Sequence, residues 1–333
     1  MTDSTTPRVL VLSGEPPPGL EPLDGRAELR IVTEDRLAAE LPAADALLVW
    51  DFATDALPAA WPREGGPRWV HTASAGVDRL MFPALVESDT VLTNARGVFE
   101  QPIAEYVAGQ VLALAKDFAG TYERQRRRVW EHRVTERVGG TRAVVVGGGP
   151  IGRATARTLG ALGLRVALVG RTARADDPEV GRVHAFAELD ALLPEADWVV
   201  SAAPLTDQTR DMFDARAFAL MKRGARFLNV GRGPLVVEDD LLAALRARQL
   251  AGAALDVFRE EPLTDGSPLW DAPGLLVSPH MSADTTTWLD DLAAVFVDNF
   301  GRWRAGRPLR NVVDKKLGYV PYAATAEAEG ALR

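Results

Sequence analysis

A glycine-rich turn after a run of valines constrains the fold of this 333-residue chain more than any other feature of its sequence. Residues 144–152 are Val-Val-Val-Gly-Gly-Gly-Pro-Ile-Gly, in which the glycines at 147, 149 and 152 have the GxGxxG spacing. Glycine triplets also occur in ordinary loops, so the context decides. Residues 153–162 are compatible with a helix, Gly163 ends it, and residues 165–169 supply a second strand. The pattern predicts a βαβ unit that binds a dinucleotide pyrophosphate at Gly147, Gly149, Pro150, Ile151 and Gly152.

The bulk composition is that of a folded protein with room for two domains. Apolar residues make up 47% of the chain and charged residues 25%, the balance of a soluble globular protein. The formal net charge of −8 argues against general nucleic-acid binding, because phosphate contacts require clustered positive charge. The chain has no cysteine, which excludes disulfides and metal sites built on sulfur. No apolar run reaches membrane-spanning length, and we expect a cytoplasmic protein with no membrane partner and no metal.

Two α/β units follow one another along the chain. In the first, strands are predicted at 8–12, 29–32, 46–50, 68–71 and 91–93, before a buried helix at 103–114. In the second, they are predicted at 143–146, 165–169, 198–202, 226–230 and 253–257, with a further edge at 275–278. Residues 285–305 have a helical pattern and are expected to pack back on the first unit. We therefore predict two Rossmann-like, doubly wound parallel-sheet domains: a flavodoxin-like substrate domain (residues 1–101 and 286–333) and an inserted dinucleotide-binding domain (residues 102–285).

Polar residues follow three strands of the second unit, at the point where each strand ends. These segments are Asn-Val-Gly-Arg-Gly at 229–233, Asp-Val-Phe-Arg-Glu-Glu-Pro at 256–262 and Ser-Pro-His at 278–280. Because the carboxyl ends of parallel strands face one ligand crevice, we expect these residues to converge. Together with the glycine motif, Ser-Ala-Gly-Val-Asp at 74–78 and Pro-Leu-Thr at 204–206, they resemble the D-isomer-specific 2-hydroxyacid dehydrogenases. The resemblance covers most of the chain.

The resemblance implies a catalytic role for three of these residues in hydride transfer to a 2-oxo acid. Arg232 would hold the substrate carboxylate and the adjacent carbonyl oxygen, since a planar guanidinium forms forked hydrogen bonds that lysine does not. His280 would donate a proton to the forming alkoxide. Glu261, which the family spacing selects over Glu260, would hydrogen-bond the far ring nitrogen and stabilise the imidazolium. The resemblance assigns further cofactor contacts to Pro204, Thr209, Val230, Arg232, Asp256 and His280, with Asp256 beside the nicotinamide.

The first unit is expected to bind the substrate. Ala75 and Gly76 would offer backbone amides to the carboxylate, because a turn of small residues lets a ligand approach the main chain. Trp50, at the end of a predicted strand, resembles a tryptophan of the glyoxylate and hydroxypyruvate reductase subgroup, although core packing explains it equally well. The remaining histidines, His71, His132 and His184, are assigned ordinary structural or surface roles. We expect reduction of a small 2-oxo acid, such as glyoxylate or hydroxypyruvate, to the D-2-hydroxy acid.

The end of the second strand of the dinucleotide-binding unit favours NADP(H) over NAD(H), with NAD(H) still possible. The NAD-using pattern places an acidic residue there, which accepts hydrogen bonds from both ribose hydroxyls. Here residues 169–174 are Val-Gly-Arg-Thr-Ala-Arg, so that Arg171, Thr172 and Arg174 are available to a 2′-phosphate and no carboxylate repels it. Two alternatives stay open. The arginines cover the adenine or point to solvent, or Asp176 or Asp177 contacts the ribose if the loop folds back.

Two other functions are weighed against this one. An NAD-linked dehydrogenase of the D-3-phosphoglycerate type is disfavoured by the missing acidic residue and by the short C-terminal region. A non-catalytic, corepressor-like scaffold that senses nucleotides rests on analogy of fold alone. The resemblance also implies a homodimer formed through the nucleotide domain and the helix around Tyr106. The basic run of Arg124, Arg126, Arg127 and Arg128 is expected to be a solvated helix face, with a subunit interface as the alternative.

Overall fold

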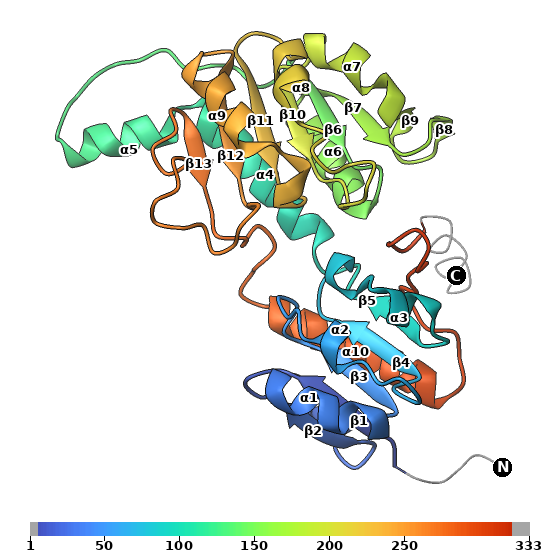
Figure 1. Cartoon of the computed structure of the whole chain (residues 1–333). Coiled ribbons are helices and arrows are strands. Elements are labelled where there is room, and N and C mark those ends of the chain that lie inside the picture. Colours follow the sequence, from blue (N-terminus) through green and yellow to red (C-terminus); the bar gives the residue numbers. More distant parts are fainter. Residues whose placement is uncertain (1–5, 322–333) are drawn as a thin grey trace. The chain divides into compact units, whose positions relative to one another are not determined.

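The structure, a computed structural model, describes residues 6–321 and divides the chain into two compact units. Unit 1 comprises Met1–Phe99 with Thr285–Arg333, and unit 2 comprises Glu100–Asp284 (Figure 1). The sequence places these junctions at 101/102 and 285/286, and the structure divides the chain at 99/100 and 284/285. Residues 1–5 and 322–333, which the sequence analysis assigned to the substrate domain, lie outside the described residues.

Unit 1 is built on a five-stranded parallel sheet. Its strands are β1 (Arg8–Leu12), β2 (Glu28–Val32), β3 (Ala46–Val49), β4 (Trp69–Thr72) and β5 (Val91–Asn94), in the order β2-β1-β3-β4-β5. Its helices are α1 (Glu34–Glu40), α2 (Leu57–Ala60), α3 (Pro83–Glu87) and α10 (Trp288–Arg304). This strand order is that of a flavodoxin-like sheet. All five strands were expected, and the helical pattern at 285–305 corresponds to α10.

Side chains that point alternately to the two faces of the sheet divide the core of unit 1 into two layers. Leu10 and Leu12 of β1 pack in a cluster with side chains of α1 and α3. Val9 and Val11, on the opposite face of the same strand, pack with Phe296 and Phe300 of α10. Successive side chains of a strand point to opposite faces, so a sheet that is covered on both sides requires apolar residues at every position. The expectation that the 285–305 segment packs on the first domain is therefore confirmed.

Unit 2 is built on an eight-stranded sheet in the order β13-β12-β11-β10-β6-β7-β9-β8. The strands are β6 (Arg142–Val146), β7 (Arg165–Gly170), β8 (Arg174–Asp177), β9 (Gly181–Ala185), β10 (Trp198–Ser201), β11 (Ala225–Asn229), β12 (Leu250–Leu255) and β13 (Leu275–Val277). Every pairing is parallel except that of β8 with β9. The central order β9-β7-β6-β10-β11-β12 is that of a Rossmann sheet, with the reversal of strand order between β6 and β10.

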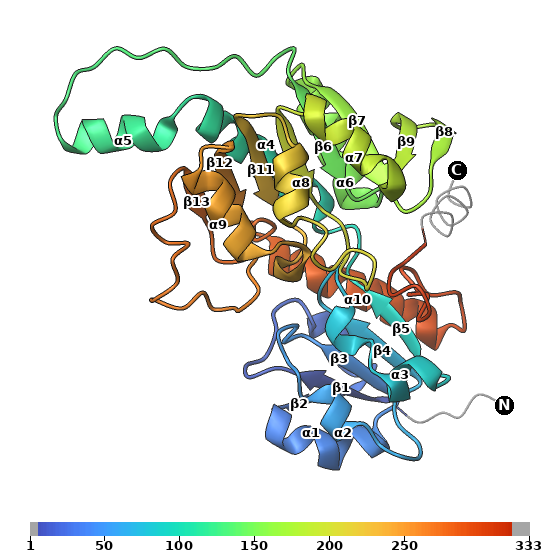
Figure 2. The same cartoon turned by 45° about the horizontal axis from the view of Figure 1, so that its top comes forward.

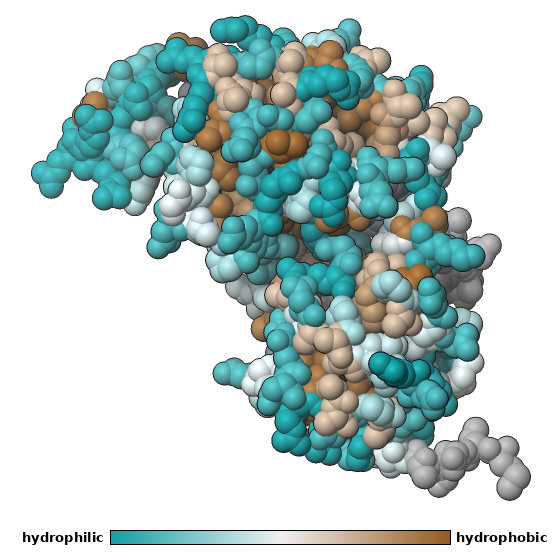
Figure 3. Space-filling model, viewed as in Figure 1, coloured by the Kyte–Doolittle hydropathy of each residue, from teal (hydrophilic) through white to brown (hydrophobic). Residues whose placement is uncertain are grey.

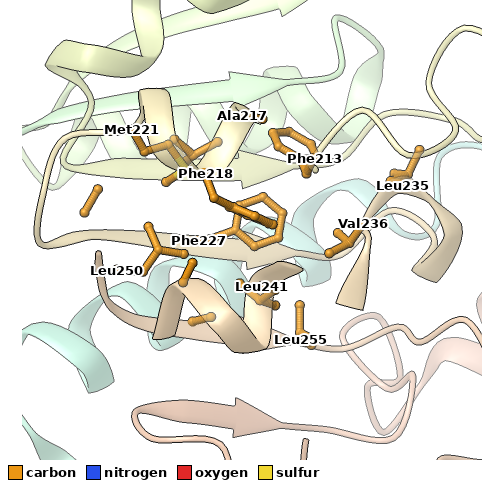
Figure 4. Close-up of a cluster of buried hydrophobic side chains, with 14 of the residues drawn as sticks. Phe213, Ala217, Phe218, Met221, Phe227, Leu235, Val236, Leu241, Leu250 and Leu255 are labelled. Atoms are coloured by element: carbon orange, nitrogen blue, oxygen red, sulfur yellow. The ribbon is translucent and has the colours of Figure 1, made fainter. Parts of the chain in front are cut away.

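Helices cover the sheet of unit 2 on both faces. They are α4 (Glu100–Ala115), α5 (Phe118–Arg126), α6 (Pro150–Ala161), α7 (Leu189–Leu192), α8 (Ala215–Leu220) and α9 (Glu238–Arg246), and α4 packs against α6. The largest apolar cluster joins the sheet to α8 and α9, where Phe218 of α8 and Leu241 of α9 lie beside Phe227 of β11 (Figure 4). In both views α5 extends away from this sheet (Figure 2). Among the helices of residues 6–321, none has the length and apolar composition of a membrane span.

The hairpin formed by β8 and β9 is not predicted from the sequence. Residues 174–177 (Arg-Ala-Asp-Asp) and 181–184 (Gly-Arg-Val-His) lack the apolar alternation that marks a strand, so the sequence indicates a loop after residue 170. These strands lie at the edge of the sheet, where one side is solvated and polar residues are tolerated. The strands expected at 198–202, 226–230, 253–257 and 275–278 each end one or two residues earlier in the structure, so their last predicted residues belong to the loops described next.

Candidate active site

The glycine motif connects β6 to α6 and fits the main chain of a dinucleotide-binding turn. Gly147 has a φ of 135°, and a side chain there would collide with the backbone of Ala202. A Cβ at Gly152 would collide with the carbonyl oxygen of Gly147, so the first helical turn packs directly on the strand end. At Gly149, in contrast, a Cβ would meet no atom within 4 Å. The first and third glycines are thus required by the fold itself, whereas the second borders open space.

The open space beside Gly149 lies at a helix N-terminus. Gly149 is the N-cap residue of α6, and Pro150 occupies its first turn, where the missing amide hydrogen costs nothing. The N-terminal amides of a helix of 12 residues provide hydrogen-bond donors and a partial positive charge. Together with a backbone that no side chain shields at Gly149, these groups fit a pyrophosphate.

The predicted 2′-phosphate residues lie at the end of β7 and the start of β8. Arg171, Thr172 and Arg174 are all exposed. Asp177, at the end of β8, is buried in an ion pair with Arg153 of α6. The Asp177 carboxylate is occupied inside the unit, whereas Asp176 is exposed, so the alternative of a ribose contact now rests on Asp176 and stays a prediction.

The loop after β10 contains the predicted contacts Pro204 and Thr209. Pro204 is exposed, whereas Thr209 is only 1% exposed. The Thr209 hydroxyl donates to the Pro204 carbonyl oxygen at 2.7 Å and accepts a hydrogen bond from the Thr206 amide at 2.9 Å. Thr209 therefore holds the shape of this loop, and what the loop offers to a ligand is the exposed ring of Pro204.

His280 and Glu261 form the centre of the site. His280 Nδ1 donates to Glu261 Oε2 at 2.7 Å, and the backbone amide of Phe258 donates to Glu261 Oε1 at 2.8 Å. Burial raises the pKa of Glu261, but the hydrogen bonds from His280 and Phe258 and the nearby charge of Arg232 outweigh it, so that the pKa lies below its ordinary value. Glu261 is thus ionised at neutral pH and orients the ring. The His280 side chain remains 38% exposed, so part of the ring is open to a ligand.

Arg232 follows β11 in an extended conformation, with a φ of −145°. The Asn229 side chain shapes this turn: its amide nitrogen donates to the Arg232 carbonyl at 2.9 Å, and its amide oxygen accepts from the Gly231 N–H at 3.1 Å. Arg232 Nη1 also donates to the Gly231 carbonyl oxygen at 2.9 Å. Since the charge of Arg232 lowers the pKa of Glu261, the structure brings together the three residues predicted to be catalytic. Val230, the neighbouring cofactor candidate, is 8% exposed.

Asp256 holds the loop that carries His280. Its Oδ1 accepts hydrogen bonds from the Ser278 hydroxyl at 2.6 Å and the Met281 amide at 3.0 Å, and its Oδ2 accepts from the Ser282 amide at 2.9 Å. The carboxylate is 1% exposed, and its own carbonyl accepts from the His280 amide at 2.8 Å. The contact predicted between Asp256 and the nicotinamide stays a prediction. What the geometry gives this residue is the fixed position of the histidine loop.

Tyr106 of α4 continues this network and was not predicted to belong to the site. Its hydroxyl hydrogen-bonds the Ser278 hydroxyl, which in turn donates to Asp256. Burial raises the pKa of Tyr106 above its ordinary value, so the phenol stays protonated. Sequence alone gave no signal for this contact, because 172 residues separate the two hydroxyl groups along the chain.

Unit 1 contains the residues predicted to bind substrate. Ala75 and Gly76 lie in the loop after β4, and within the described residues their backbone amides donate no hydrogen bond. The loop is held through its carbonyl groups. The Ser74 hydroxyl donates to the Gly76 carbonyl at 2.6 Å, and the Asn94 side chain donates to the Ala75 carbonyl at 2.6 Å. Trp50 follows β3 and lines a cavity of about 320 Å³ together with Ser13, Gly14, Asp51, Phe52, Trp288, Leu289 and Leu292. These aromatic side chains give the cavity an apolar wall.

Comparison with known proteins decides the family. Residues 108–282 match the NAD binding domain of the D-isomer specific 2-hydroxyacid dehydrogenases. The chain belongs to this family. It is 33% identical over 257 residues to glyoxylate/hydroxypyruvate reductase B of Salmonella newport (strain SL254), a match that covers 74% of this chain and 78% of that protein.

Solved structures of relatives have the same two-domain fold. An NADPH-dependent glyoxylate/hydroxypyruvate reductase from Sinorhizobium meliloti, in complex with NADP and sulfate, has a TM-score of 0.81 and 28% identity, covering 94% of this chain and all of that one. A D-isomer specific 2-hydroxyacid dehydrogenase from Xanthobacter autotrophicus Py2, in complex with NADPH and MES, has a TM-score of 0.78 and 30% identity, covering 95% and 100%. Membership of the family makes this dehydrogenase an oxidoreductase acting on a CH–OH group, with a nicotinamide dinucleotide as its cofactor and a small molecule as its substrate.

Proposed function

We propose that this dehydrogenase reduces a small 2-oxo acid of the glyoxylate or hydroxypyruvate type to the D-2-hydroxy acid, and that it prefers NADPH. The observation that carries the proposal is the His280–Glu261 pair beside Arg232, in a domain with a dinucleotide-binding glycine turn. A proton donor, an oriented carboxylate and a permanent cation are the groups that reduction of a carbonyl next to a carboxylate requires. The curated relative named a glyoxylate/hydroxypyruvate reductase supports the substrate class.

The residues of the site divide the chemistry among them. When bound, the nicotinamide supplies the hydride. Arg232 binds the substrate carboxylate and polarises the carbonyl through its forked donors, so that negative charge forming on the oxygen is stabilised. His280 donates a proton from Nε2 to that oxygen and is left neutral with its hydrogen on Nδ1. The Glu261 carboxylate, which only accepts hydrogen bonds, holds this hydrogen throughout and so fixes Nε2 as the atom that exchanges the proton.

Two further groups are proposed to hold the substrate carboxylate. The amides of Ala75 and Gly76 have no acceptor within the described residues, and the hydrogen bonds from Ser74 and Asn94 fix the loop that presents them. Backbone amides of this kind bind anions without a charged side chain. The apolar cavity at Trp50 is proposed to take the part of the substrate beyond its 2-oxo group.

The preference for NADPH rests on the charge distribution at the end of β7. Arg171, Thr172 and Arg174 are exposed there, and the nearby Asp177 carboxylate is buried in its ion pair with Arg153. On residues 170–174 a 2′-phosphate would therefore meet cationic donors and no exposed carboxylate. An NAD-selecting site instead has an acidic residue at the end of this strand, which binds the ribose hydroxyls. The Sinorhizobium meliloti relative, described as NADPH-dependent, supports the same preference.

We also propose that the dehydrogenase forms a homodimer through unit 2, at the helix around Tyr106 as the family resemblance implies and at the segment that begins at α5. The face of unit 2 that Figure 3 shows is largely hydrophilic, with scattered apolar groups. Along this segment, however, Phe118 and Tyr122 are more than half exposed, Val134 is 93% exposed and Trp130 is fully exposed. Such side chains on an extended arm are typical of a surface that is covered by a second copy. A monomeric mass by light scattering at micromolar concentration would contradict the dimer.

The proposed reaction is tested by initial rates of nicotinamide absorbance loss. Glyoxylate, hydroxypyruvate, pyruvate and phenylpyruvate are each supplied with NADPH and, in parallel, with NADH. We expect turnover of the small acids, with kcat/KM higher for NADPH. Turnover that prefers NADH would keep the reductase and reject the arginine site. Saturable cofactor binding without turnover of any acid would reject the reductase and favour a nucleotide-sensing scaffold.

A further inference from the structure

A buried ion pair ties the glycine-rich turn of unit 2 to the hairpin of β8 and β9. Arg153, the residue after the last glycine of the motif, donates from Nη1 to Asp177 Oδ1 at 2.6 Å and from Nη2 to Asp177 Oδ2 at 2.5 Å. Both side chains are 1% exposed. A parallel, two-pronged contact of this kind fixes the relative orientation of its partners as well as their distance.

Each partner of the pair is also bonded to the main chain of its own segment. Arg153 Nε donates to the Gly148 carbonyl oxygen at 3.1 Å, inside the glycine turn. Asp177 Oδ1 accepts from the amides of Glu179 at 3.1 Å and Val180 at 3.3 Å, inside the hairpin turn. The hydrogen bonds from Arg153 hold the pKa of Asp177 well below its ordinary value, so the carboxylate is ionised at every physiological pH. The pair thus connects the glycine turn and the hairpin turn through five hydrogen bonds.

Burial of two charges is weak evidence for stability, because desolvation offsets much of their attraction and apolar side chains of similar volume often serve as well. A buried pair is better explained by what it positions. Of the two connected segments, the glycine turn is the one that the proposed function assigns to the pyrophosphate, and the hairpin is the one whose first strand begins at Arg174, a residue proposed for the 2′-phosphate. Arg174, one of the exposed 2′-phosphate candidates, lies 3.4 Å from Asp177 through its Nη1 and begins the strand that Asp177 ends.

We propose that Arg153 and Asp177 form a positioning pair that sets the preference for a dinucleotide with a 2′-phosphate. The inference rests on the proposed NADPH preference and identifies what maintains it. The pair acts through position: it holds the start of β8 so that Arg174 and the preceding turn keep one geometry. Neither residue needs to touch the cofactor.

The test measures dissociation constants of NADPH and NADH by fluorescence titration, without any turnover. NADPH and NADH differ only in the 2′-phosphate. The ratio of the NADH dissociation constant to the NADPH dissociation constant therefore measures the preference for NADPH, and a general loss of binding cancels in it. For Asp177→Asn and for Arg153→Gln we expect the NADPH constant to rise about tenfold and the NADH constant to change less than about twofold. The matched control is Arg157→Gln, which breaks the exposed Arg157–Glu179 pair on the same helix and is expected to leave the ratio unchanged.

Three results would overturn the positioning pair. An equal loss of NADPH and NADH would mean that the pair only maintains the fold. Opposite signs for the two variants, with Asp177→Asn tightening NADPH, would mean that net charge and not position sets the preference. An unchanged ratio in both would mean that the hairpin keeps its geometry without the pair.

A variant that fails to fold does not end the test. The double variant Arg153→Leu, Asp177→Leu removes both charges while filling the space, and in it the ratio must also fall if position matters. Hydrogen exchange of residues 171–185, measured with NADPH bound, should rise in every variant that lowers the ratio, and unchanged exchange would contradict the inference. The wild-type ratio tests the proposed NADPH preference separately: a wild type that binds NADH more tightly rejects that preference before any variant is made.

Discussion

At the scale of single residues, the two adjacent carboxylates 260 and 261 offer a direct test of the site. Glu261 accepts the hydrogen bond from His280, whereas Glu260 is exposed and makes no such contact. Replacing Glu261 by Gln removes the charge that orients and stabilises the imidazolium. We expect kcat for 2-oxo acid reduction to fall about 10²-fold, within the range that acid–base groups contribute, with an unchanged dissociation constant for NADPH.

The matched control for this prediction is Glu260→Gln, measured in the same assay. It changes the net charge by the same amount at the neighbouring position, and kcat should stay within about twofold of wild type. Equal losses in both variants would mean that the charge of the segment matters and the contact does not. A loss in Glu260→Gln alone would show that the family spacing selected the wrong carboxylate.

Arg171 carries the second prediction at this scale. A guanidinium that binds a 2′-phosphate contributes about 1.5–3 kcal/mol, as hydrogen bonds to charged groups do. Arg171→Ala should therefore raise the NADPH dissociation constant at least about tenfold and leave that of NADH within about twofold. Arg216→Ala, at an exposed arginine of α8 that pairs with Asp190, provides the control. Equal weakening of NADPH and NADH by Arg171→Ala would place the arginine on the part that the two cofactors share.

At the scale of elements, the start of α6 contains one glycine that the fold requires, Gly152, and one that is proposed to face the cofactor, Gly149. Gly152→Ala would force a Cβ into the Gly147 carbonyl oxygen, and we expect a loss of at least about 2 kcal/mol in stability, as for overpacked positions. Gly149→Ala has open space and a φ of −81°, so the melting temperature should hardly change while the NADPH dissociation constant rises at least tenfold.

Gly160, later in the same helix, is the control for both substitutions. A Cβ there meets no atom within 4 Å, and alanine is favoured over glycine inside a helix by about 0.5–1 kcal/mol. Gly160→Ala should therefore raise the melting temperature slightly and leave cofactor affinity unchanged. If Gly149→Ala bound NADPH as tightly as Gly160→Ala does, the proposed pyrophosphate position would be wrong.

The elements that could be predicted from the sequence are those with a strong apolar pattern. The central strands of both sheets are buried on two sides, and their runs of Val, Leu and Ala mark them directly. The β8–β9 hairpin lies at an edge, so its polar sequence carries no such pattern. Arg153, next to the glycine motif, begins the stretch that the sequence predicts to be helical, but no rule of spacing indicates that its partner lies 24 residues away.

The candidate site was predictable to the same extent. Arg232, Glu261 and His280 were identified because their positions after strands match a family pattern, and the structure brings the three together. The roles of the Thr209 and Asp256 side chains could not be predicted from the sequence. The family pattern assigns both residues to the cofactor, whereas in the structure both side chains form internal hydrogen bonds. A motif predicts which residues are near a ligand. Which of them touch it depends on hydrogen-bond partners that are distant in sequence.

At the scale of the whole molecule, the groups that the proposed reaction requires are divided between two independently cored units. Unit 2 holds the glycine turn and the His280–Glu261 pair, and unit 1 holds the Ala75 and Gly76 amides. Each unit has its own sheet and its own apolar clusters. The pH dependence of unfolding is therefore expected to follow groups within each unit.

His71, in the centre of unit 1, makes this expectation specific. It lies on β4, fully buried, with Nδ1 2.8 Å from the Thr93 hydroxyl, and its Nε2 has no hydrogen-bond partner among the described residues. Burial lowers the pKa of His71 to about 3 from an ordinary value of 6.5. The unfolded chain binds a proton at this residue below pH 6.5, and the folded chain does not until about pH 3. Its contribution to stability is thus constant above pH 6.5 and is lost as the pH falls below it.

We expect His71 to lower the free energy of unfolding by about 2 kcal/mol between pH 7 and pH 5, since 1.5 pH units below the ordinary value correspond to about 1.4 kcal/mol each. His71→Gln cannot titrate in this range, so its free energies of unfolding at pH 7 and pH 5, measured in urea, should differ less than those of the wild type by about that amount. His132→Gln, at an exposed histidine, should leave the difference unchanged. If His71→Gln and the wild type lost the same stability on acidification, His71 would be protonated in the folded state, and the buried layer between the sheet and α10 would have to admit a charge.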